Sequence, residues 1–214
     1  MLLLLPCATA FYISIDNKKG EIKNIYSATL FGLIAGILYS FLDVLFTSDY
    51  YIAKYSIFSN LLHFGFIEML IPIIIITSLY FVFIKSYDEM FKALFYVFLA
   101  FFAVYMPVRI ISRNENIHYF LLFFKPTLFL LSILYCRKII FRIYNKLKTC
   151  KMSFKSLGIP IVLMIIVLLV PATAESMWLI GFSTWSWMVL FFVYLASYII
   201  LEIILHKVFV TKID

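Results

Sequence analysis

Long apolar runs separated by short charged segments are the feature that most constrains how this chain folds. Most of the runs have about the 20 residues that a helix needs to cross a bilayer. Hydrocarbon offers no hydrogen bonds to the backbone, so such runs predict membrane-spanning helices whose amides are bonded internally. The seven runs are 2–15, 26–46, 57–84, 93–111, 117–136, 157–172 and 185–205.

The composition excludes soluble classes of protein. Apolar residues make up 65% of the 214 and charged residues 14%, against about 45–50% and about 25% in globular domains. So few charges cannot cover the surface of a soluble domain of this size. We therefore predict a single integral membrane domain over residues 1–214, folded as an all-α polytopic transmembrane helix bundle. We expect seven spans, or six if the short first or sixth run does not cross.

The positions of lysine and arginine predict an orientation. Fourteen of these residues lie after the first, third, fifth and seventh runs, and three lie at the alternate connections. Lys and Arg gather on the cytoplasmic side of membrane proteins. The N-terminus is therefore expected outside and the C-terminus in the cytoplasm, most simply of a bacterial cytoplasmic membrane. Because these loops explain the net charge of +7, no nucleic-acid partner is expected.

The segment 137–156 is the longest and most basic connection. We predict a cytoplasmic loop there. Because Ile139, Ile140 and Phe141 lie among its charges, the alternative is an interfacial amphipathic helix that binds anionic lipid at the inner leaflet.

Polar side chains within the apolar runs are candidates for function, since a charge in hydrocarbon costs a few kcal/mol. Glu68 and Lys125 are both expected near mid-depth. They form either an interhelical ion pair that fixes packing or the wall of a polar cavity. Asn60 and His63 lie near Glu68 in the sequence and complete the predicted intramembrane polar centre. The other ionisable residues in or beside the runs are Asp43, Arg109, His118 and Glu202.

His63 and Glu68 do not have the spacing of a metal site. Residues five apart on an α-helix point about 140° away from each other, so the two side chains are expected on different faces. No second cluster of histidine and carboxylate residues completes a coordination sphere. We predict no metal and no cofactor.

The second run contains a stripe of small residues that predicts close helix packing. Small residues at intervals of four let helix backbones approach one another. The contact is either within the chain or an interface with a second copy or another membrane protein. The stripe consists of Ala28, Gly32, Gly36 and Ser40, and Asp43 lies about one turn further on.

Several short motifs lie between residues 1 and 140. They include 65–70 (GFIEML), 87–89 (YDE) and 99–103 (LAFFA). In order and spacing they resemble the PrsW-type intramembrane proteases, which belong to the glutamate-dependent membrane proteases. The resemblance implies that Glu68 would be the catalytic residue.

This chain departs from the family pattern at the other functional positions. The second glutamate of the family's pair would fall at Met69, the glutamate of the next helix at about Met106, and the later histidine near Lys125. One carboxylate without a second acid or a histidine does not readily activate water. We therefore expect a non-enzymatic membrane protein, either a small transporter subunit or a binding or scaffolding component of a membrane complex. The alternative is a divergent PrsW-like protease that uses Glu68.

Overall fold

The computed structural model describes residues 4–19, 25–47, 56–83, 87–112, 120–148 and 154–210. These residues are almost entirely helical and include no β-strand. Five helices within them are long and apolar enough to cross a membrane, and a shorter apolar helix covers Leu4–Asp16. The prediction of an all-helical fold is confirmed for these residues, and the five helices support a chain embedded in a membrane. The five are Ile25–Leu45, Ile57–Phe83, Phe91–Ser112, Gly158–Leu179 and Thr184–Leu201.

The helices follow the predicted runs wherever the chain is described. Three elements in the middle of the chain, α3, η1 and α4, continue into one another without a break and form one rod. The short element η2 leads in the same way into α6. The bounds are α1 Leu4–Lys19, α2 Ile25–Thr47, α3 Ile57–Leu62, η1 His63–Leu70, α4 Ile71–Phe83, α5 Tyr87–Ser112, η2 Phe120–Phe124, α6 Lys125–Lys148, α7 Phe154–Leu179 and α8 Thr184–Val210.

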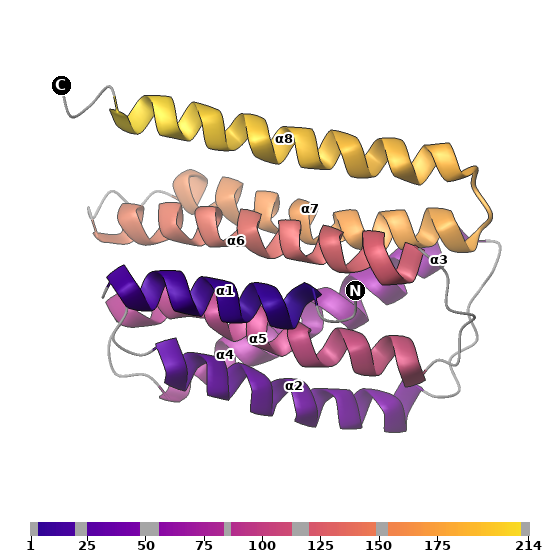
Figure 1. Ribbon diagram of the computed structural model, residues 1–214, viewed down its shortest axis with the longest axis horizontal. Coiled ribbons are helices and arrows are strands. Elements are labelled where there is room, and N and C mark those ends of the chain that lie inside the picture. Colours follow the sequence, from indigo (N-terminus) through magenta and orange to yellow (C-terminus); the bar gives the residue numbers. More distant parts are fainter. Residues whose placement is uncertain are drawn as a thin grey trace.

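Helix α5 forms the centre of the bundle. Its residues 93–103 are all buried, and it contacts α1, α2, α4 and α6. Helices α6 and α7 pack side by side, with α8 beyond them at the edge of the bundle (Figure 1). The helices run roughly along one direction, so their ends gather at two ends of the bundle. We call the end where α2, α5 and α7 finish and α3, η2 and α8 start the α3 end (right in Figure 1).

The small-residue stripe of α2 packs against α5 within the same chain. A Cβ placed on Gly32 would collide with the carbonyl oxygen of Val97, and one on Gly36 would lie 2.9 Å from that of Phe101. Ala28 and Ser40 are buried on the same side. Only glycine permits this approach, so the intramolecular alternative explains the stripe.

Helices α6 and α7 both extend past the C-terminal ends of the apolar runs that predicted them, into polar residues. The basic segment was predicted as a loop, but its residues 137–148 continue α6. The first part of this extension is packed in the bundle, where Ile140 is buried. Helix α7 continues beyond residue 172 to Leu179, because Glu175 and Ser176 are buried as part of the helix.

The elements η1 and η2 are π-helical, with a wider turn than the α-helices around them. Each ends two residues before a proline: η1 before Pro72 and η2 before Pro126. A proline ring clashes with the carbonyl of the residue four positions earlier and has no N–H to donate. A wider turn just before the proline is compatible with both restrictions, although Pro107, Pro160 and Pro171 lie inside α-helices without one.

Two carbonyls that prolines leave without an N–H are bonded by side chains from other helices. In the i→i+5 register of η1, Pro72 would pair with the carbonyl of Ile67, and the Tyr39 hydroxyl of α2 donates to that oxygen at 2.8 Å. Similarly, Pro171 in α7 cannot donate to the carbonyl of Val167, which accepts from the Ser132 hydroxyl of α6 at 3.0 Å. In a membrane, neighbouring helices commonly satisfy carbonyls freed in this way.

Candidate functional site

Five buried charged side chains of alternating sign form a continuous chain through the bundle. Arg109 bonds the Asp43 carboxylate at 2.7 Å and the Glu68 carboxylate at 3.2 Å. Lys125 lies 3.4 Å from the other oxygen of Glu68 and 2.5 Å from Glu175. We call this set of five residues the ion network. Each of its side chains is at most 4% exposed.

Each member of the ion network comes from a different element. Asp43 belongs to α2, Glu68 to η1, Arg109 to α5, Lys125 to α6 and Glu175 to α7. Asp43, Arg109 and Glu175 lie in about the last turn of their helices, so the network belongs to the α3-end half of the bundle. The Tyr105 hydroxyl extends the network by donating to Asp43 at 3.2 Å. The network therefore links five helical elements that are far apart in the sequence.

Glu68 occupies the middle of the ion network, and both of its oxygens contact a cation. Oε1 accepts from Arg109 and Oε2 from Lys125. The side chain is 1% exposed. The predicted contact between Glu68 and Lys125 is thus present, but it is the longer of the two contacts that Lys125 makes with carboxylates.

The structure corrects the expectation that His63 and Glu68 point to different faces. The two residues lie in η1, where hydrogen bonds join residues five apart, so positions 63 and 68 are about one turn from each other. Both reach Arg109: His63 Nε2 lies 3.4 Å from its Nη2 and Glu68 Oε1 lies 3.2 Å from its Nε. The α-helical spacing of 100° per residue was the wrong geometry for this segment.

His63 meets Arg109 through its ring nitrogen Nε2, at 3.4 Å from Nη2. A guanidinium can only donate hydrogen bonds, so Nε2 is the acceptor in this contact.

Asn60, the fourth member of the predicted polar centre, is 0% exposed. Its Oδ1 and Nδ2 have no hydrogen-bond partner within the described part of the chain. The structure thus brings His63, Glu68 and Lys125 into contact through the ion network and leaves Asn60 outside the bonded set.

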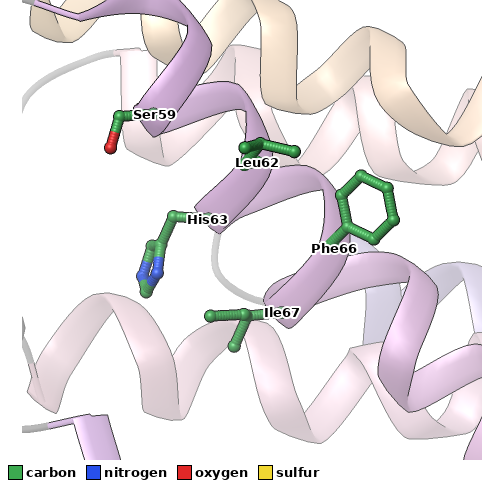
Figure 2. Close-up of a pocket in the computed structure, with 5 residues that line it drawn as sticks. All are labelled: Ser59, Leu62, His63, Phe66 and Ile67. Carbon is green, nitrogen blue, oxygen red and sulfur yellow. The ribbon is translucent and has the colours of Figure 1, made fainter.

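A shallow groove of about 380 Å³ lies beside the ion network on the surface of the rod. It is lined by Ser59, Leu62, His63, Phe66 and Ile67, which recur every three or four residues along one face of the rod (Figure 2). His63 is the residue that both lines this groove and contacts Arg109. The groove is mostly apolar, and its open side continues into the exposed surface of the rod at Leu62 and Phe66.

The sequence did not indicate two parts of the site. Glu175 was expected in a loop because the sixth run ends at residue 172, yet the segment 172–179 has no glycine or proline to end a helix. That lack of a helix-ending residue was the available signal. Asp43 was expected beside the small-residue stripe and among the ionisable candidates, as was Arg109, but nothing in the sequence pairs the two. His118 and the side chain of Glu202 lie outside the described residues.

A second buried carboxylate lies at the opposite end of the bundle. Asp16 of α1 binds Arg137 of α6 at 3.0 Å and accepts from the Tyr96 hydroxyl. Arg137 also lies over the Phe95 ring, 4.5 Å from its centroid. Asp16, Arg137 and Tyr96 thus join three helices, α1, α6 and α5, at the end away from the ion network.

Within the described ranges, no group of three or more His, Cys, Asp or Glu side chains is arranged to hold a metal ion. The three carboxylates of the ion network are separated from one another by Arg109 and Lys125. No protein-family model, no curated protein and no solved structure matches the chain.

Proposed function

We propose that this chain is a non-enzymatic polytopic membrane protein, either a small transporter subunit or a binding or scaffolding component of a membrane complex. The observation that supports this most is the state of Glu68. Both of its oxygens contact cations, and the network around it is bonded charge to charge. Such an arrangement fixes the relative positions of helices.

The alternative is a divergent PrsW-like protease that uses Glu68 as its acid–base residue. Two observations favour keeping it: η1 is a π-helix, an element frequent at functional sites, and Asp43 and Glu175 bring further carboxylates into the same network. A general base must reach the water from which it takes a proton. Each oxygen of Glu68 already contacts a cation, Arg109 or Lys125, which favours the non-enzymatic proposal.

The proposal includes seven spans in a bacterial cytoplasmic membrane, with the N-terminus outside and the C-terminus in the cytoplasm. Helices α1 and α6 would provide the two spans beyond the five long apolar helices. Their packing against α5 in the same bundle supports this. A reporter fused after Asp214 should be active only on the cytoplasmic face, and activity only on the outer face would contradict the orientation.

We propose two kinds of partner besides the bilayer. The small-residue side of α2 is covered by α5, so a membrane protein or a second copy would meet the opposite side, where Leu30, Ile34 and Phe41 are exposed. Anionic lipid would bind the basic segment 137–156 at the cytoplasmic surface.

Glu68→Gln separates the two functions. We would tag the full chain, express it in cells, purify it in a mild detergent, and compare the variant with Asp16→Asn, which removes a buried carboxylate at the opposite end. A membrane component should purify in a complex of unchanged mass in both variants, since Arg109 and Lys125 each keep a shorter contact with another carboxylate.

A protease would give a different result. Cleavage of a membrane protein that requires the chain, and that stops in Glu68→Gln but continues in Asp16→Asn, would establish the enzyme and refute the proposal.

A further inference from the structure

Asn60 is the strongest sign that the polar centre binds something. It lies in the segment Ile57–Phe83, which is apolar enough to cross a membrane, and its amide is completely buried without a partner. A buried polar group that is left unbonded costs about 1–3 kcal/mol. Nearly all such groups in native proteins bond to protein or to an ordered molecule.

The packing of the rod against α7 places Asn60 at the depth of the ion network. Gly65 meets Leu169 and Ala172 of α7, and the two elements run in opposite directions. Asn60 lies five residues from Gly65 towards the α3 end. Glu175 and Ser176 lie three and four residues from Ala172 in the same direction along α7. Because α3 packs against α7, the buried amide lies at the level of the Lys125–Glu175 ion pair.

Phe64 is near Asn60 in the sequence and near Lys125 in space. It is one turn from Asn60 on the rod, and its ring centroid is 5.7 Å from the Lys125 ammonium. The ring is 1% exposed. Any molecule that bonds both Asn60 and the ion pair is therefore a neighbour of a phenylalanine that bulk solvent does not reach.

The chemistry of these groups defines the ligand. A carboxamide offers both donors and an acceptor, so its partner must accept and donate. The charges of the ion pair already compensate each other, so an uncharged partner fits best. Water meets both requirements, and internal waters typically make about three hydrogen bonds to buried polar groups.

We propose that this polar centre contains a hydration site, in which an internal water between α3 and α7 connects Asn60 with the Lys125–Glu175 ion pair. The inference assigns a ligand to the polar centre whose role is proposed above. Its test measures no transport, assembly or proteolysis, so it succeeds or fails independently of that function.

Hydroxyl-radical labelling of the purified full chain tests the proposal. Radicals formed by a short X-ray pulse from a bound water modify side chains beside it, even where bulk solvent has no access. Phe64 should be modified several-fold faster than Phe101 and Phe102, which are equally buried in the core of α5. Labelling of Phe64 no faster than these two would overturn the proposal.

Asn60→Leu provides the second measurement. The variant replaces the amide with an apolar side chain that has the same number of heavy atoms, so Phe64 labelling should fall to the rate of the core phenylalanines. Thr29→Val, which removes a buried hydroxyl bonded within its own helix, is the control and should leave Phe64 labelling unchanged. Phe64 labelling that stays as fast in Asn60→Leu as in the unaltered chain would refute the hydration site.

Discussion

Removing Arg109 should destabilise the protein far more than removing Glu68, although the two residues are in contact. Arg109 binds Asp43 at 2.7 Å, Glu68 at 3.2 Å and His63 at 3.4 Å. Arg109→Met takes the nearest cation from two buried carboxylates at once. Loss of one partner from a buried ion pair typically costs about 3–5 kcal/mol, and we expect a loss in that range.

Glu68→Gln should cost only about 1 kcal/mol, the value of an ordinary hydrogen bond. Each cation keeps its shorter contact, Arg109 with Asp43 and Lys125 with Glu175 at 2.5 Å. The glutamine can still accept a hydrogen bond at the position of one carboxylate oxygen. The ion network therefore tolerates the loss of its central anion better than the loss of a cation.

The free energy of unfolding can be measured by titration with SDS in mixed micelles. Cys136 is 1% exposed, so its reaction with a thiol reagent reports loss of tertiary packing once Cys7 and Cys150 are replaced by serine. Arg137→Met is the matched control: its side chain is 36% exposed, and its loss should cost about 1–2 kcal/mol. If the free energies of unfolding of Arg109→Met and Glu68→Gln differ by less than about 1 kcal/mol, the cation is no more important to the network than its central anion, and the reasoning is refuted.

Three further predictions concern packing and the proline sites. Gly32→Ala should destabilise the protein by about 1–3 kcal/mol because the new methyl group collides with α5. Gly158→Ala, with open space around it, should be neutral or stabilising by up to about 1 kcal/mol. The same SDS titration compares the two variants, and equal effects would contradict the close approach of α2 and α5. Tyr39→Phe should cost about 1–3 kcal/mol because it leaves the buried Ile67 carbonyl unbonded. The cost should be smaller in a Pro72→Ala background, where residue 72 regains a backbone N–H. A double-mutant cycle that shows no coupling would mean that the Tyr39 hydroxyl does not replace that N–H. Cys136 should resist a membrane-permeant maleimide in the folded protein while the exposed Cys7 reacts, as mass spectrometry of the labelled chain would show; rapid labelling of both would mean that α6 is not packed in the bundle.

The apolar runs predicted the helices because hydrophobic length is a local property of the sequence. Their ends were less predictable where polar residues continue a helix inside the bundle. Glu175 looked like a loop residue because its partner, Lys125, is 50 positions away, and nothing near it in the sequence shows that its charge is compensated.

The π-helix at His63–Leu70 was not predictable from periodicity alone. The pattern of apolar residues was interpreted at 3.6 residues per turn, and nothing in it marks the wider turn of this segment, where a Tyr39 hydroxyl from another helix bonds the Ile67 carbonyl. The wider turn changes which residues share a face. For the same reason the spacing of His63 and Glu68 argued against a shared site that the structure contains.

The order in which the five charges of the ion network occur along the chain affects how the protein is made. Asp43 and Glu68 are synthesised first, then Arg109 and Lys125, and Glu175 last. If the helices enter the membrane in this order, the first two carboxylates wait there until the cations arrive on α5 and α6. During that interval the charges must stay hydrated or be shielded by the insertion machinery, since each costs a few kcal/mol in hydrocarbon. A ribosome stalled before Arg109 has left the exit tunnel should therefore yield a nascent chain whose second and third helices remain extractable, and one stalled after Lys125 has left the tunnel should yield helices that resist extraction.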